Sequence, residues 1–405
     1  MVRFTINPNN NFDINNLRIA LLNYIISKQK DDIFILKVED IEIKDNIDKK
    51  VGEIKDILKK FSITEEQIIY QSDNLKIYQQ FAYQLVRNKS AYLCFCLDNS
   101  RKCSCQNLPN NEIESKLNSK EKYSIYIKNT NQSFKINDII QGEVVVNSLN
   151  SFLILDENET PAGIFANAID DMLIGTSIAI NSYDLLKDTI KQIYIHNLLG
   201  YNQNIHYAHL PAITDSKSIK ELFYDGYIPD AIINYILNIS YNNANKEIFY
   251  LPDAIEWYDI SKVSKESIGF DLNTLKFLNQ KHLYIMDNKK LSSIFGFADE
   301  DIGRLLKLYL KNISTINELD AVFKDIFSKK ECNNIMKELS NIIMKAPMID
   351  DFEGFKSYLL RKSKMSEEEL LKNLKLLIAG NSIGVELKDI YMLIKPYILE
   401  VAKCH

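Results

Sequence analysis

Strand-like and helix-like segments alternate over the first ninety residues of the chain. Residues 33–38 (IFILKV) form a short apolar run followed by two carboxylates, a pattern typical of a buried parallel strand. A helical pattern with one apolar face precedes this run at 15–30, and further helical patterns follow at 48–61 and 74–86. Such alternation predicts an α/β domain, in which crossover helices cover a parallel sheet.

The α/β pattern is then interrupted and later resumes. Residues 94–160 contain cysteines, short strand-like runs and polar turns, which predicts an insertion into the α/β domain. The α/β pattern returns near residue 178, and from about residue 240 the chain reads as helical. We therefore expect a split α/β domain at 1–72 and 184–238, an inserted subdomain at 73–183, and helical regions at 239–300 and 301–405.

Composition narrows the class of protein. With 46% hydrophobic and 25% charged residues, the 405-residue chain has the composition of a soluble globular protein. No apolar run reaches the length of a membrane span and no signal-peptide pattern opens the chain, so we expect a cytoplasmic protein without a membrane partner. The net charge of -5 argues weakly against nucleic acid, although a local basic face is enough to bind phosphates.

A dozen short stretches follow one another in the order of a known family. They are RF at 3–4, NLR at 16–18 with ALLNY at 20–24, FILKVED at 34–40, YQS at 70–72, AYLCFC at 91–96, FANAIDD at 165–171, KQ at 191–192, LGY at 199–201, AHLP at 208–211, GYIPDA at 226–231, KVSK at 262–265 and FD at 270–271. Any one of these short matches is weak evidence for a family. Together with a further match at 376–380, 384 and 386–387, they extend over nearly the whole chain, and the sequence resembles the glutamyl-tRNA synthetases, a family of class I aminoacyl-tRNA synthetases.

The resemblance implies a fold and a set of partners. It implies a Rossmann-like catalytic domain with an inserted acceptor-stem-binding subdomain, followed by an all-α part of the anticodon-binding type. The family activity is the ATP-dependent attachment of glutamate to tRNA. The implied partner is a glutamate- or glutamine-type tRNA, or another translation protein, rather than DNA.

Two motifs that serve ATP in the family are degenerate. The HIGH-type motif reads Asp13-Ile14-Asn15-Asn16, with a carboxylate in place of the first histidine and an amide in place of the glycine on which adenine packs. The lysine-rich KMSKR-type motif, normally just after AHLP, is missing behind Pro211. Glycine is also scarce, at 12 residues, although nucleotide sites depend on it. ATP binding is therefore in doubt, and we assign no catalytic residue.

The glutamate pocket implied by the resemblance has also changed. Family positions for a serine, a tyrosine and an arginine hold Asn7, Gly163 and Asn181. Arg3 and Glu39 survive, and we assign both to substrate binding. For Arg3 two interpretations stay open, a bidentate contact to a carboxylate of the substrate or a residual ion pair.

Four of the six cysteines suggest a metal site. A disulfide scaffold is not expected in a long cytoplasmic chain. Two close pairs of thiols can close on one zinc ion, and relatives carry zinc at this place in the insertion. We therefore predict a structural zinc bound by Cys94, Cys96, Cys103 and Cys105, with four reduced cysteines packed as small apolar residues as the alternative.

Positions outside the catalytic centre are better preserved. By the resemblance, Lys262 and Lys265 contact the tRNA stem and Lys375 lies in the anticodon-binding part, where lysine suits phosphate. Three hypotheses result: a catalytically impaired paralogue that binds tRNA or a translation partner, an active ligase with a rebuilt site that uses Lys217 and Lys220, and a structural subunit without tRNA affinity.

Overall fold

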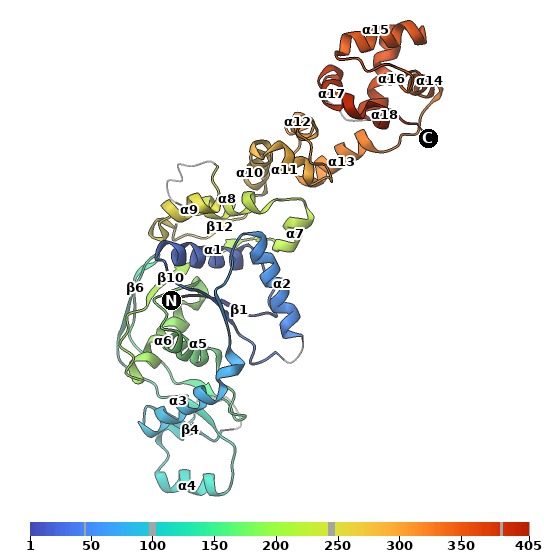
Figure 1. Cartoon of the computed structure of the whole chain (residues 1–405). Coiled ribbons are helices and arrows are strands. Elements are labelled where there is room, and N and C mark those ends of the chain that lie inside the picture. The colour runs from blue at the N-terminus through green and yellow to red at the C-terminus, as the bar shows by residue number, and fades with distance from the viewer. Residues whose placement is uncertain (44–45, 97–102, 242–247, 381–383, 405) are drawn as a thin grey trace. The chain divides into compact units, whose positions relative to one another are not determined.

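The computed structural model describes residues 1–43, 46–96, 103–241, 248–380 and 384–404 (Figure 1). It contains two compact units. The first is formed by Met1–Ile219 and Ile236–Phe270, and the second by Lys220–Tyr235 and Asp271–His405. Among the described residues, no helix is both long and apolar enough to cross a membrane. The finer domain boundaries expected from the sequence stay a prediction.

A five-stranded parallel sheet forms the centre of the first unit. Its strand order is β10-β9-β1-β2-β3. The strands are β1 (Val2–Ile6), β2 (Phe34–Val38), β3 (Gln67–Tyr70), β9 (Ile178–Ser182) and β10 (His206–Leu210). Strand β2 is buried at every position, as its apolar run predicts for a strand with both faces covered. The predicted α/β fold class is confirmed.

Helices connect and cover these strands. They are α1 (Ile14–Gln29), α2 (Ile47–Lys60), α3 (Leu75–Arg87), α5 (Gly163–Ile174), α6 (Leu186–Leu198) and α9 (Leu251–Trp257). The expectation of a single apolar face on the first helix was wrong, because Arg18, Asn23 and Ser27 of α1 are buried as well. Asn23 and Ser27 donate hydrogen bonds to carbonyls within the helix, and Arg18 donates to the carbonyl of Pro211. Each of these side chains therefore makes at least one hydrogen bond, which offsets part of the cost of its burial, although Arg18 Nε and Asn23 Oδ1 are buried without a partner.

The insertion between β3 and α5 is mainly antiparallel. It contains β4 (Ala91–Cys94), α4 (Asn110–Asn118), β5 (Ser124–Ile127), β6 (Phe134–Asp138), β7 (Gly142–Val146) and β8 (Phe152–Leu155). Strands β4, β5 and β8 form one sheet, β6 and β7 pair as a hairpin, and the short β11 (Ile213–Thr214) pairs with β12 (Ile268–Gly269).

A buried polar chain ties the β6–β7 hairpin to the parallel sheet. His209 of β10 places Nδ1 2.6 Å from Asp138 of β6 and Nε2 2.9 Å from the hydroxyl of Thr189. All three residues are buried. Burial raises the pKa of Asp138, but the hydrogen bond and charge of His209 and the hydrogen bonds from the amides of Ile140 and Gln141 together outweigh this effect and leave the pKa lowered. The arrangement joins the insertion to the sheet.

The second half of the chain is helical, as expected. Its helices are α7 (Ile219–Tyr224), α8 (Pro229–Ile239), α10 (Leu272–Ile285), α11 (Asn288–Ser293), α12 (Glu300–Tyr309), α13 (Ile316–Phe327), α14 (Asn334–Ile343), α15 (Phe352–Ser363), α16 (Glu367–Ala379), α17 (Leu387–Ile394) and α18 (Ile398–Val401). Side chains of Asp299, Thr315 and Asp351 cap α12, α13 and α15 and fix where these helices begin. A Cβ on Gly303 of α12 would lie 2.1 Å from the carbonyl oxygen of Asn288, so only glycine allows α11 and α12 to pack this closely.

The two cysteines outside the insertion form a disulfide. Cys332 and Cys404 are joined across 72 residues of sequence, with their Cα atoms 5.6 Å apart. The sequence analysis gave no reason to expect this bond.

Candidate active site and cysteine cluster

The first turn of α1 is capped by the chain's own carboxylate. Asp13 accepts a hydrogen bond from the backbone amide of Asn16 at 2.9 Å, and the Asn16 side chain accepts one from the amide of Asp13 at 3.2 Å. This reciprocal pair is a capping box. A helix N-terminus is otherwise a ready site for anions, because its amides point outward and the helix dipole favours negative charge. Here an aspartate already occupies that place.

The segment behind Pro211 closes over the same helix end. The Asn15 side chain donates to the Ile213 carbonyl at 3.0 Å and accepts from the Ile213 amide at 2.8 Å. The Ser216 hydroxyl donates to Asp13 Oδ2 at 2.8 Å. Asp13 and Ser218 also form a short antiparallel bridge. The two degenerate motif regions are therefore brought together, and their polar groups bind one another.

Arg3 forms a buried ion pair within the protein. Its Nε and Nη2 atoms donate to the two carboxylate oxygens of Asp171 at 2.8 and 2.9 Å, and Nη1 donates to the Asn181 side chain at 3.2 Å. Both partners of the pair are almost fully buried. Burial raises the pKa of Asp171, but the charge and hydrogen bonds of Arg3 outweigh it, and the pKa lies below its usual range. Two of the five N–H donors of Arg3 therefore already bind a carboxylate of the chain.

Glu39 belongs to a second polar network beside this pair. It accepts a hydrogen bond from the Asn167 side chain at 2.9 Å, and the oxygen of Asn167 accepts one from Lys37 at 2.6 Å. Lys37 lies 3.4 Å from a carboxylate oxygen of Asp170, and both side chains are fully buried. Arg3 and Lys37 are thus balanced by the adjacent aspartates 170 and 171, and Glu39 leaves one negative charge in excess.

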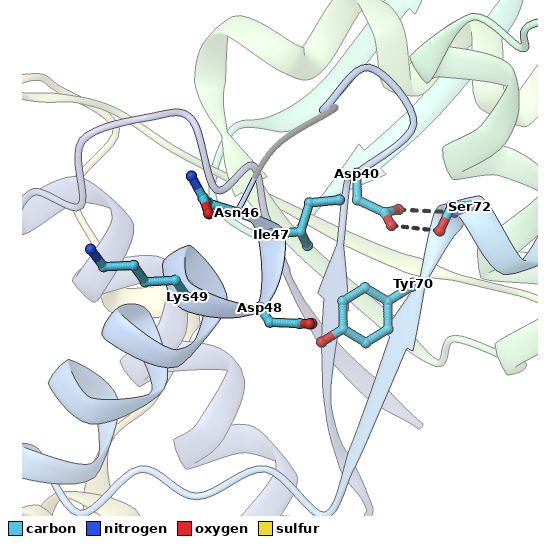
Figure 2. Close-up of a pocket in the computed structure, with 7 residues that line it drawn as sticks. All are labelled: Asp40, Asn46, Ile47, Asp48, Lys49, Tyr70 and Ser72. Carbon is cyan, nitrogen blue, oxygen red and sulfur yellow. Dashed lines mark hydrogen bonds between the residues drawn. The ribbon is translucent and has the colours of Figure 1, made fainter.

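A pocket of about 590 Å³ opens beside the carboxyl ends of β2 and β3 (Figure 2). Its lining residues are Asp40, Asn46, Ile47, Asp48, Lys49, Tyr70 and Ser72. Ligands of open α/β sheets bind at this end of the strands. The Asp40 carboxylate is already bound by the amide and hydroxyl of Ser72, at 2.9 and 2.5 Å. With two carboxylates and one lysine, the lining is poorly suited to a triphosphate.

The four cysteines of the insertion gather around one point. Cys94 ends β4, and the thiol pairs 94–103, 96–103 and 96–105 are 3.4, 3.6 and 3.5 Å apart. All four sulfur atoms lie within 4.8 Å of one another. Tetrahedral zinc with Zn–S bonds of about 2.3 Å requires sulfur atoms about 3.8 Å apart. The backbone amide of Cys105 also donates to the sulfur of Cys103. This cluster could hold a metal ion.

The lysines assigned to tRNA lie in both units. Lys262 and Lys265 are exposed in the first unit, and the ammonium of Lys265 donates to the Gln141 carbonyl at 3.2 Å. Lys375 is half-buried on α16 of the second unit. Their assignment to tRNA stays a prediction.

Comparison with known proteins decides the family. Residues 1–277 match the family model described as "tRNA synthetases class I (E and Q), catalytic domain". The chain belongs to this family. It is 41% identical to a Sulfurovum protein named glutamate–tRNA ligase 2, over 99% of this chain and 100% of the relative. It is 37% identical to a Sulfurimonas denitrificans protein of the same name, with complete coverage of both.

A solved synthetase of the family shares the fold. The glutamate tRNA ligase from Elizabethkingia meningosepticum covers 99% of this chain and 98% of its own, with a TM-score of 0.82 at 20% identity. Class I synthetases use ATP and act on tRNA.

Sequence reasoning missed several members of these regions. Asp170 and Asp171 were quoted as part of a motif but given no role, and Asn167, which joins Glu39 to Lys37, was not considered. Their position in the FANAIDD stretch was the available signal. Ser216 carried no signal, because its contact to Asp13 spans 203 residues.

Proposed function

We propose that this synthetase-family protein is impaired or inactive in activating glutamate and acts by binding a glutamate- or glutamine-type tRNA or a translation partner. The observation that carries the proposal is the closed network at the start of α1. Asp13, Asn15 and Ser216 bind one another where the family presents imidazole and lysine groups to ATP.

Electrostatics supports a large loss of ATP affinity and rate. A carboxylate about 4 Å from one phosphate charge is unfavourable by about 4 kcal/mol at an effective dielectric constant near 20. Removing one preorganised charge-stabilising group typically raises the barrier by about 2.7–4 kcal/mol. Loss of the imidazole and of the lysine loop then lowers the rate by about 10⁴- to 10⁶-fold.

The amino-acid region supports the same conclusion. Glutamate carries two carboxylates and one ammonium, so its pocket needs surplus positive charge. Asn181 stands where the family resemblance implies an arginine, and it contacts Arg3 directly. The remaining cations are held by Asp170 and Asp171, and Glu39 makes the surroundings net negative.

A second candidate is an active glutamate–tRNA ligase with a rebuilt site. The names of the relatives favour it, since a protein 41% identical over its full length is called glutamate–tRNA ligase 2. Such a site would recruit other cations. Lys217 is one, because its carbonyl accepts from the amide of Ile14 and places it beside α1.

Two assays separate these functions. Glutamate-dependent ATP–pyrophosphate exchange should stay at background in the proposed function, and a gel shift should detect a tRNA complex. The double variant Lys262→Ala, Lys265→Ala should weaken that complex, whereas Lys59→Ala, an exposed lysine on α2 outside the segments assigned to tRNA, serves as the control. Robust glutamylation of tRNA by the unmodified protein would establish the second candidate, and no tRNA binding would leave only a structural role.

We also propose that the four insertion cysteines bind one structural zinc ion. The sulfur separations and the amide hydrogen bond to Cys103 support this assignment. Four protein ligands leave no open position for catalysis. The proposed tRNA partner also implies a cytoplasmic location, which stays a prediction.

A further inference from the structure

The C-terminal segment of the second unit is fastened to the segment that follows α13. The disulfide joins Cys404 to Cys332, and Cys404 also forms a parallel bridge with Lys330. Both cysteines are partly exposed, so a reductant can reach the bond.

Lys330 reinforces the same attachment from inside. Its side chain is buried, and Nζ donates to the carbonyl of Ile326 at 2.7 Å and to that of Val401 at 3.1 Å. It therefore joins the C-terminal ends of α13 and α18. Burial lowers the pKa of Lys330 to about 8, with Asp325 opposing the shift. The C-terminal segment is thus held both by the hydrogen bonds of Lys330 and by a disulfide that can be reduced and formed again.

The attachment borders a groove lined by lysines. A pocket of about 440 Å³ is lined by Lys337, Ser340, Asn341, Met344, Lys403 and Cys404. A second pocket of about 530 Å³, between α14 and α15, is lined by Asn334, Lys337, Glu338, Asn341, Ile342, Lys345, Tyr358 and Lys362. Lys337 and Asn341 line both pockets, so we treat the two as one lysine groove. Lys403, next to Cys404, lies at its edge.

We propose that Cys332–Cys404 is a thiol–disulfide switch that, when oxidised, holds Lys403 at the lysine groove and strengthens binding of RNA phosphates there. The proposal rests on the proposed function, because RNA is taken as the ligand. A lysine fixed in place loses less freedom on binding than one on a loose chain end. Lysines and one tyrosine suit the phosphates and bases of RNA.

The switching step is thiol–disulfide exchange with a dithiol reductant. A thiolate of the reductant attacks one sulfur of the disulfide and forms a mixed disulfide. The second thiol of the reductant then displaces the protein sulfur. The reductant becomes a disulfide, and two electrons and two protons pass to Cys332 and Cys404. Disulfides that form in reducing compartments are commonly redox-sensing.

The experiment compares the full-length protein after treatment with oxidised glutathione or with dithiothreitol. Thiol titration of the metal-free denatured chain should find four free cysteines in the first state and six in the second. Hydrogen exchange of residues 398–404 should be slower in the oxidised state. The tRNA dissociation constant should be about two- to fivefold lower in the oxidised state, because one lysine contact to phosphate is gained.

Variants assign the effect to this disulfide. Cys404→Ser should behave like reduced protein under both treatments, although the insertion cysteines see the same oxidant. Lys403→Gln should weaken tRNA binding by the oxidised protein to the level of the reduced protein. Lys388→Gln, an exposed lysine outside the groove, is the matched control and should change nothing.

The outcomes separate this inference from the proposed function. Equal tRNA affinity in both states, with tRNA bound, would overturn the switch alone. No tRNA binding in either state would overturn both the switch and tRNA binding as the proposed function. If the protein binds poly-glutamate more strongly than tRNA, the ligand of the lysine groove is an acidic protein and not RNA. That result would overturn the assignment of RNA as the ligand.

Discussion

Replacing Asp171 by asparagine tests whether the Arg3–Asp171 pair is a structural element of the first unit. The change leaves the Arg3 guanidinium buried without its carboxylate partner. Breaking a buried pair in this way typically destabilises a protein by about 3–5 kcal/mol. For a unit of this size, each kcal/mol shifts Tm by about 2–4 °C, so the first unit should unfold about 6–20 °C earlier.

Differential scanning calorimetry measures this shift. Lys135→Ala, which removes the exposed pair Lys135–Glu143, should change Tm by at most about 2–4 °C, because exposed pairs contribute at most about 1 kcal/mol. The double variant Arg3→Met, Asp171→Leu should recover part of the loss, since it leaves no buried charge unpaired.

The pH dependence provides an independent check. The folded-state pKa of Asp171 is lowered, so its stabilising contribution is fully present above the ordinary aspartate pKa of about 3.9 and is lost as the pH falls through the lowered value. The difference in Tm between the natural protein and Asp171→Asn should therefore be constant from about pH 8 to pH 5 and shrink below about pH 4. A Tm shift under 2 °C at pH 7 would refute the structural role. It would favour the other interpretation of Arg3, a contact to a carboxylate of the substrate.

The other predictions concern the helix end, the metal and tRNA. Asp13→Ala should destabilise the first unit by about 1–2 kcal/mol through loss of the cap, and Asp13→His should not restore pyrophosphate exchange, because the lysine loop is still missing; restored exchange would show that this one side chain blocks activity. Purified protein should contain about one zinc per chain, and Cys94→Ser or a strong chelator should remove it and lower Tm; metal analysis without zinc would contradict this. Replacing Lys262 and Lys265 by alanine should reduce the salt dependence of tRNA binding by up to about two units of slope, without sequence preference; an unchanged slope would exclude both as phosphate contacts. Lys375→Ala should lower that slope by about one unit.

The sequence predicted those parts of the fold that depend on local pattern. The apolar run at 33–38 contains the whole of β2, and the cysteine spacing anticipated the gathered thiols. The local sequence pattern did not predict which polar side chains are buried, because that depends on residues far away in the sequence. Arg18 is buried on α1 because the Pro211 carbonyl, 193 residues away, accepts its hydrogen bond.

The same limit applies to the candidate site. The family resemblance predicted that Asp13 stands at a histidine position, but gave no indication that Ser216 would donate to it across the folded structure. It also left the role of Arg3 undecided, because its partner Asp171 comes from an element 168 residues later in the chain. Pairings of this kind depend on the three-dimensional position of the strands.

The order of strands in the parallel sheet has a consequence for synthesis of the chain. Strand β1 pairs with β2 on one side, but its other neighbour is β9, where Val2 is matched with Ile178. At about 5–20 residues per second, roughly 9–35 seconds separate the emergence of these two strands from the ribosome. Throughout that interval one edge of β1 can pair with other chains. Yield in cells should therefore depend on chaperones that shield the nascent N-terminal segment, even for variants whose finished fold is fully stable.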